Sequence, residues 1–214
     1  MDSKKIKVMT PKIALYEGHK NINLYKDETK DLYYVYKGGA ILGRFYNVSD
    51  AIKTADENFG CVLDAEGHYI WKKQSYSTTN QIMRITGSKA DDENSSFETC
   101  LETVLDFYGY NNNVKSDLSA KKDPNETVME IIPDSMAMTL RNVSTEELKY
   151  YLNRDIPVIV MAGEQSVLLI GYSDSVNVWM NPQTGNIMKV DVSEAERFYE
   201  QNGYCFMVVE VWKS

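Results

Sequence analysis

The sequence predicts an α+β fold, because its helical and strand patterns are grouped along the chain instead of alternating in βαβ units. Apolar residues recur at helical spacing over 97–108, and the last third of the chain is a succession of short strands. The turns at 173–175 and 182–185 are too short for crossover helices, so this sheet is expected to be largely antiparallel. A polar stretch over 74–96 separates the two patterns, and the expected domains are 1–80 and 81–214.

The first domain is expected to be a small β-rich unit with one helix. Segments rich in Tyr, Ile and Val predict strands at 13–16, 22–25, 32–36 and 41–46. Ser49 or Asp50 is expected to cap a helix that continues through Ala55. Residues 61–63 and 68–71 then flank the turn 64–67, which predicts a β-hairpin.

The second domain is expected to begin with the helix over 97–108, which stops at Gly109, a residue suited to the left-handed position after a helix. Loops and short helices are expected over 111–133. Ser144 and Glu147 form a capping box for a helix that ends at Leu152, and Ser193 with Glu196 is expected to cap another over 193–201. The remaining segments predict strands at 158–161, 167–172, 176–180, 187–192 and 206–212.

The overall charge argues against two classes of partner. The 214 residues include 23 Lys and Arg against 31 Asp and Glu, which gives a net charge of −8 and a pI near 4.9. Nucleic acid and anionic membrane surfaces attract clustered positive charge, so neither is expected as a partner. No apolar run approaches the ~20 residues of a membrane span. The first residues lack the apolar middle of a signal peptide, which leaves an intracellular chain or a mature secreted chain as alternatives.

Metal and cofactor sites are not expected. Cys61, Cys100 and Cys205 are too few and too scattered for a disulfide scaffold, although a Cys61–Cys205 bridge is left open. With only His19 and His68 to join them, a zinc site is improbable. The chain has no GxxxxGK[ST], GxGxxG, HExxH or G-x-S-x-G motif, and the acidic run at 89–94 lacks the glycine and the final glutamate of a calcium loop.

Several segments of the second domain resemble a known family. A capped helix ending in Tyr-Gly is followed by Ile-Pro-Val-Ile-Val at 156–160, by Ser-Val-Leu-Leu-Ile-Gly-Tyr at 166–172, and by Val-Asn-Val-Trp-Met-Asn-Pro at 176–182. This order resembles the bacteriocin-processing peptidases, which cleave after double-glycine leaders and belong to the papain-fold cysteine peptidases. The resemblance covers residues 95–212 and implies a papain-like domain. A weaker similarity, over 45–71, concerns a segment that sometimes precedes such domains.

The resemblance also implies where a catalytic triad would lie. The family's nucleophilic cysteine stands thirteen residues before the glycine that ends the helix, and here that residue is Ser96. Its histidine precedes the strand at 167–172, where this chain has Gln165. Its third member precedes the proline at 182 and corresponds to Asn181; for the oxyanion-hole glutamine, Glu93 and Asn94 are the nearest polar residues. A serine without a general base is a poor nucleophile, and Gln165 cannot accept a proton.

Each of these residues also has a non-catalytic interpretation. Ser96 is expected to act as the helix N-cap, and Cys100 as a packed, unreactive thiol. Gln165 and Asn181 either share a hydrogen bond or merely end their strands. His19 and His68 are expected in exposed loops.

The preferred hypothesis is a catalytically degenerate peptidase-like protein whose former cleft binds a peptide or a protein partner. The alternative is an active hydrolase with a relocated nucleophile, Cys100 or Ser96, and His68 as the base. A third hypothesis is an interaction module whose groove has closed. The sequence gives no indication of oligomeric state.

Overall fold

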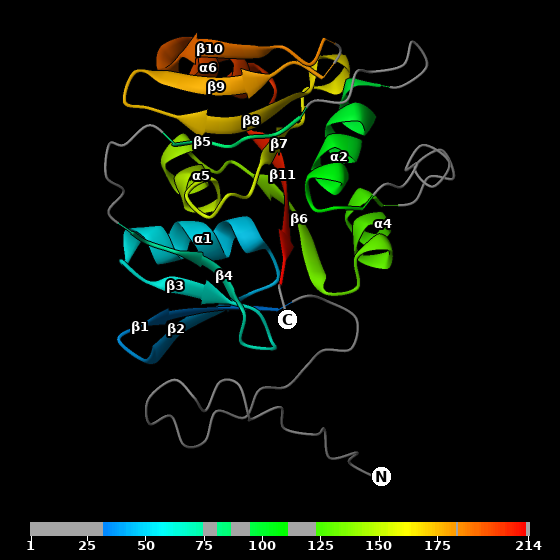
Figure 1. The fold of residues 1–214 in the computed structure, drawn as a ribbon. Coiled ribbons are helices and arrows are strands. Elements are labelled where there is room, and N and C mark those ends of the chain that lie inside the picture. The colour runs from blue at the N-terminus through cyan, green and yellow to red at the C-terminus, as the bar shows by residue number, and fades with distance from the viewer. Residues whose placement is uncertain (1–31, 75–80, 87–94, 111–122, 183, 213–214) are drawn as a thin grey trace. The chain divides into compact units, whose positions relative to one another are not determined.

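The computed structural model describes residues 32–74, 81–86, 95–110, 123–182 and 184–212, which form two compact units, Met1–Ser75 and Tyr76–Ser214 (Figure 1). The strands expected at 13–16 and 22–25, together with His19, Glu93 and Asn94, lie outside the described residues. Within the described part, no helix is long and apolar enough to cross a membrane.

The first unit contains a four-stranded sheet with one helix packed on it. Its strands are β1 (Tyr33–Lys37), β2 (Ala40–Phe45), β3 (Cys61–Leu63) and β4 (Tyr69–Lys72), in the order β2-β1-β3-β4 with every neighbouring pair antiparallel. The expected hairpin at 61–71 is therefore present. Helix α1 (Val48–Glu57) buries Ala51, Ile52 and Ala55.

The start of α1 differs from the expectation. Asn47, and not Ser49 or Asp50, is the N-cap, because its side-chain oxygen accepts hydrogen bonds from the backbone N–H groups of both those residues. The end of α1 turns tightly into β3 at Gly60. A Cβ atom at Gly60 would lie 2.4 Å from the backbone oxygen of Tyr36, so the close approach of these two chain segments requires glycine.

The second unit contains a seven-stranded antiparallel sheet. Its order is β10 (Ile187–Asp191), β9 (Val176–Met180), β8 (Val167–Tyr172), β7 (Val158–Val160), β11 (Cys205–Val211) and β6 (Ser135–Arg141), and the short β5 (Gln81–Ile82) also pairs with β8. The predicted antiparallel arrangement is confirmed. Strand β6 was not expected, although Met136, Met138 and Leu140 alternate with smaller or polar residues, as in a half-buried strand.

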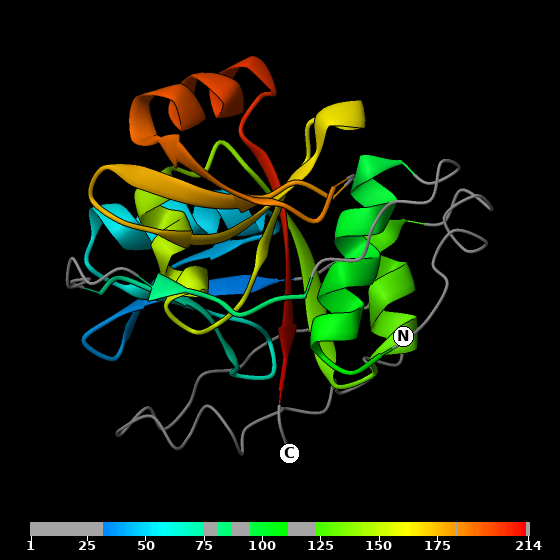
Figure 2. The same cartoon turned by 45° about the horizontal axis from the view of Figure 1, so that its top comes forward.

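Helices cover both faces of this sheet. Helices α2 (Ser96–Phe107) and α4 (Pro124–Ile131) lie together on one side of the central strands, and α5 (Thr145–Leu152) lies on the other (Figure 2). Helix α6 (Val192–Gln201) packs on β9 and β10. Because both faces are covered, β7 and β8 are buried at every residue, and they form the centre of the core.

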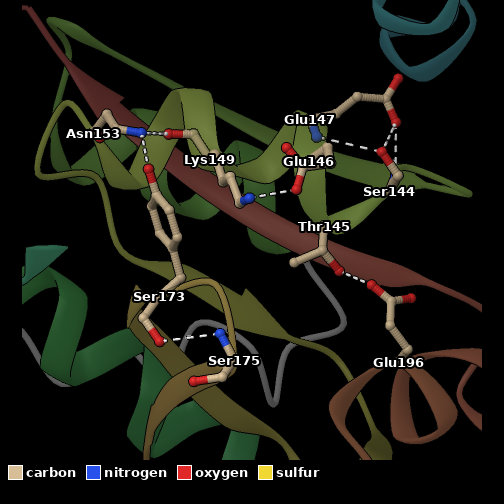
Figure 3. Close-up of polar contacts among 10 residues, drawn as sticks. Ser144, Thr145, Glu146, Glu147, Lys149, Asn153, Ser173, Ser175 and Glu196 are labelled. Atoms are coloured by element: carbon tan, nitrogen blue, oxygen red, sulfur yellow. Dashed lines mark hydrogen bonds and ion pairs between the residues drawn. The ribbon is translucent and has the colours of Figure 1, made fainter. Parts of the chain in front are cut away.

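The helix starts test the capping predictions. Ser144 and Glu147 form the expected capping box at α5. The capping box expected from Ser193 and Glu196 at α6 is wrong. The N-cap is Asp191, whose carboxylate accepts a hydrogen bond from the N–H of Ser193. Glu196 instead accepts a hydrogen bond from the Thr145 hydroxyl (Figure 3). A carboxylate two residues before Ser193 offers a stronger acceptor than the serine hydroxyl and moves the start of the helix.

Candidate functional site

The candidate site is the end of the second unit at which α2, β8 and β9 meet. Ser96 is the first residue of α2, and the expectation that it is the N-cap is wrong, because Ser95 holds that position. Ser95 Oγ accepts from the N–H of Glu98, and Glu98 Oε2 accepts from the N–H of Ser95 at 2.8 Å, which is a complete capping box. The motif Ser-x-x-Glu at 95–98 is the sequence signal that identifies this cap.

The Ser96 hydroxyl is buried and used in two hydrogen bonds. It donates to the carbonyl of Gly163 over 3.1 Å and accepts from the N–H of Ser166 over 3.0 Å, and the residue is only 4% exposed. Both partners belong to the segment that leads into β8, so the hydroxyl ties the first turn of α2 to that segment. The proton of this hydroxyl is held by a backbone carbonyl, which is not a general base, and the described residues place no such base at Ser96 Oγ.

Ser166 completes this connection, and sequence analysis did not identify it. Its hydroxyl accepts from the N–H of Ala162 over 3.1 Å and donates to the Gly163 carbonyl over 2.9 Å. Gly163 has φ of +60°, a conformation that L side chains rarely adopt, and its carbonyl accepts from both serine hydroxyls. We refer below to Ser96, Gly163 and Ser166 as the serine clasp. No sequence motif marks it, because Ser96 is 67 residues from Gly163 and 70 residues from Ser166 in the chain.

Gln165 and Asn181 lie at the same end of the sheet as the serine clasp. Gln165 ends the 3₁₀ turn η2 (Gly163–Gln165) and is exposed. Asn181 follows β9, whose Met180 pairs with Leu168 of β8, so antiparallel pairing places Asn181 beside the start of β8. The side-chain oxygen of Asn181 accepts from the N–H of Thr184 over 3.2 Å, and this bond shapes the turn to β10.

The three cysteines are free thiols, and the Cys61–Cys205 bridge left open by the sequence is not formed. Cys100 is 1% exposed on the inner face of α2, where burial raises the pKa of its thiol far above the ordinary value. Cys205 is 8% exposed, and burial raises the pKa of its thiol as well. Cys100 is therefore packed in the core, as the sequence predicts, and its burial disfavours the reactive thiolate.

His68 is less exposed than the sequence predicts. Its side chain is 21% exposed, and Nδ1 lies 2.8 Å from Oδ2 of Asp64, while Oδ1 of Asp64 accepts from the N–H groups of Glu66 and His68. Asp64, Glu66 and His68 bring one ligand atom each within 4.8 Å of the others, so they are the described residues best able to hold a metal ion. Their contacts are those of an Asx turn that shapes the β3–β4 hairpin.

The second unit has the α+β fold of the papain-like peptidases. No family model matches the chain, and no curated protein matches it. Among solved structures, it is similar to one described as a C39-like peptidase from Bacillus anthracis, with 15% sequence identity and a TM-score of 0.51. The similarity covers 64% of this chain and all of that one. At this identity, the likeness establishes the fold and leaves the activity to be argued from the site.

Proposed function

We propose that this chain is a catalytically inactive peptidase-like protein that binds a peptide, or an extended loop of a partner, at the end of the sheet marked by Ser96, Gln165 and Asn181. The observation that carries the proposal is the serine clasp. The hydroxyl that replaces the family's nucleophile is committed to two internal hydrogen bonds and is shielded from solvent.

The proposal also rests on the absence of a base. The sequence has two histidines, His19 and His68, and neither belongs to residues 76–214. The second unit therefore contains no imidazole that could take a proton from Ser96 or Cys100. Because burial strongly disfavours the thiolate of Cys100, a relocated cysteine nucleophile is also unfavourable. These points favour the inactive protein over the hydrolase alternative.

The polar groups that remain at this end suit a peptide main chain. Gln165 is exposed, and Asn181 is partly exposed; each carries an amide that donates and accepts hydrogen bonds. Peptide N–H and C=O groups need both kinds of partner. The resemblance to bacteriocin-processing peptidases suggests a peptide that ends in two glycines, because such a segment fits a narrow groove without side chains.

The lack of catalysis can be tested by rebuilding the missing pair. The full chain should not hydrolyse fluorogenic peptide substrates, whereas S96C/Q165H should show alkylation of residue 96 by iodoacetamide at pH 6, at least tenfold faster than S96C alone. The imidazole would stabilise the thiolate. Peptide mass spectrometry separates residue 96 from the other three cysteines, and S96C/Q165N is the matched control. Hydrolysis by the unmodified chain that S96A or C100A abolishes would overturn the proposal.

Binding can be measured separately. A fluorescein-labelled decapeptide ending in Gly-Gly should raise its anisotropy when the full chain is added, and Q165A should weaken binding at least threefold. Q201A is the matched control, because Gln201 is an exposed glutamine at the end of α6. Equal weakening by both variants, or no binding at millimolar protein, would contradict a peptide site at this end.

A further inference from the structure

A second candidate site lies at the opposite end of strands β8 and β9. A pocket of about 440 Å³ opens there beside the β8–β9 turn and is lined in part by Ile82, Val176, Val178 and Lys189. Strand β8 starts next to the serine clasp at Val167 and reaches the pocket at Tyr172, so the two sites are at different ends of the same strand. The pocket is therefore independent of the proposed function.

The sheet register explains why there is a hollow. Ile82 pairs with Gly171, Gly171 with Val178, and Val178 with Lys189, so these residues form one row across four strands and share one face. That face is the one turned away from α6, because Asn177 and Trp179, on either side of Val178, both donate to the hydroxyl of Tyr199 in α6. Gly171 contributes no side chain to the row, which leaves a gap between Ile82 and Val178.

The pocket combines an apolar floor with two opposite charges. Ile82 is 45% exposed and, with Val176 and Val178, supplies the apolar surface. Asp174 and Lys189 line the pocket and are exposed, and among the described residues neither has an ion-pair or hydrogen-bond partner for its side chain. With one charge of each sign, the lining does not select a simple anion or a simple cation. It suits a ligand that carries both charges around an apolar centre.

The spacing of the charges indicates the size of that ligand. Lys189 lies in the row of Gly171, whereas Asp174 lies in the turn closed by the Ser173 N–H and the Val176 carbonyl, roughly 7 Å beyond that row along the strands. It also lies one to two strand spacings from β10, about 5–10 Å across the sheet, so the two backbone positions are on the order of 10 Å apart. A free amino acid is too short to span this distance. Three residues of extended peptide reach about 10 Å between their ends.

The walls of the pocket are held in place by the surrounding structure. The Ser173 hydroxyl accepts from the N–H of Ser175 at 3.3 Å (Figure 3) and from the N–H of Val176 at 3.2 Å. These bonds fix the turn that carries Asp174. On the other face of β8, the Tyr172 hydroxyl accepts from Asn153 over 2.6 Å, and the Lys149 ammonium lies 5.0 Å from the centre of the Tyr172 ring. A preformed site loses less entropy when a ligand binds.

We infer that this pocket binds a short peptide of about three residues with free termini and an apolar central side chain. The peptide carboxylate would pair with Lys189 and its ammonium with Asp174, while the central side chain fills the gap over Gly171. This orientation pairs both charged side chains that line the pocket, Asp174 and Lys189.

The test is a titration of the ¹⁵N-labelled full chain with the tripeptide Ala-Leu-Ala, followed by amide chemical shifts. Changes are expected at Ile82, at 173–176 and at Lys189, and the N-acetylated, C-amidated tripeptide should bind at least tenfold more weakly. K189Q and D174N should each weaken binding at least threefold. K53Q and D134N are the matched controls, because both residues are exposed and lie outside the pocket.

Three results would overturn the inference: no shifts in the pocket at millimolar tripeptide, equal binding of the blocked tripeptide, or unchanged affinity in both K189Q and D174N. None of these results bears on the serine clasp, and failure of the Gly-Gly peptide to bind does not bear on the pocket. The two proposals therefore fail independently.

Discussion

The two ends of strands β8 and β9 handle their polar groups in opposite ways. At the start of β8, the protein satisfies its own hydroxyls, because Ser96 and Ser166 share the Gly163 carbonyl and bond to backbone N–H groups. At the far end, Asp174 and Lys189 border a pocket and have no partner among the described side chains. The fold thus uses its polar groups for internal bonds at Ser96 and leaves charged groups exposed at the pocket.

The two ends should therefore differ in how much their polar side chains contribute to the stability of the fold. Buried polar groups cost free energy unless they are hydrogen-bonded, so the paired hydroxyls of Ser96 and Ser166 stabilise the fold at this end. An exposed charged side chain is solvated by water, so leaving it without a protein partner costs little free energy. Stability measurements on both kinds of residue can therefore test the comparison.

The largest effect is expected at a charge that the protein has buried and paired. Glu210 is 3% exposed in β11, and its Oε1 lies 2.6 Å from the guanidinium of Arg154. R154A should lower the free energy of unfolding by about 3 kcal/mol, the low end for a broken buried pair, because solvent also reaches the Arg154 side. Urea denaturation measures the change. R197A, at an exposed residue of α6, should change stability by less than about 0.5 kcal/mol, and an equal loss in both would contradict the argument.

A smaller loss is expected when the serine clasp is opened. S96A removes the nearer of two acceptors for the Ser166 N–H and one donor to the Gly163 carbonyl, and should cost about 1–3 kcal/mol. Q165A should cost less than about 0.5 kcal/mol, because Gln165 is exposed. Thermal unfolding of both variants measures how much the Ser96 hydroxyl contributes to stability. An S96A protein that unfolds at the same temperature as the unmodified chain would show that the serine clasp contributes little to stability.

A pH-dependent effect is expected at the start of α6. Hydrogen bonds from the Ser193 hydroxyl and then from its backbone N–H lower the pKa of the Asp191 carboxyl. The stability that this cap contributes is present above the unfolded pKa of about 3.9 and is lost as the pH falls through the lower folded value. D191A should therefore melt below the unmodified chain at pH 7, and the gap should close towards pH 2.

D191N is the control for this effect, since asparagine caps helices well and does not titrate. Its melting temperature should stay close to that of the unmodified chain at pH 7. A gap between D191A and the unmodified chain that stays constant from pH 7 to pH 2 would show that the carboxylate charge is not involved.

The smallest effect on stability is expected at the pocket. K189Q should change the free energy of unfolding by less than about 0.5 kcal/mol, because Lys189 is exposed and has no side-chain partner among the described residues. Chemical denaturation measures this change, and a loss above 1 kcal/mol would show that Lys189 serves the fold. Polar side chains at both ends of β8 would then contribute to stability, and the contrast between the two ends would be lost.

Local sequence patterns predicted much of the fold. The helical spacing up to Gly109, the capping box of Ser144 with Glu147 and the short turns between the last strands all identified elements that the structure contains. Competing caps caused errors at Asn47 and Asp191, because an Asn or Asp a few residues earlier satisfies the first N–H groups of the helix better. Strand β6 was missed because its period-2 pattern follows a segment assigned to loops.

The candidate site was harder to predict from the sequence. The resemblance pointed to Ser96, Gln165 and Asn181, and all three lie at one end of the second unit. The sequence did not reveal that Ser96 is tied to Ser166, because that contact joins residues 70 positions apart. The pocket depends on the pairing of Ile82, Gly171, Val178 and Lys189 across four strands, and no local pattern encodes such a register.

The serine clasp also bears on how this chain can evolve. A thiol is a weak hydrogen-bonding group, so a single change of Ser96 to cysteine would weaken both bonds of the clasp before any histidine stood at residue 165. The reverse order would place a histidine beside a hydroxyl that is already engaged. Under the proposed function, neither single change would give activity, so a Cys–His pair at residues 96 and 165 would require both changes together.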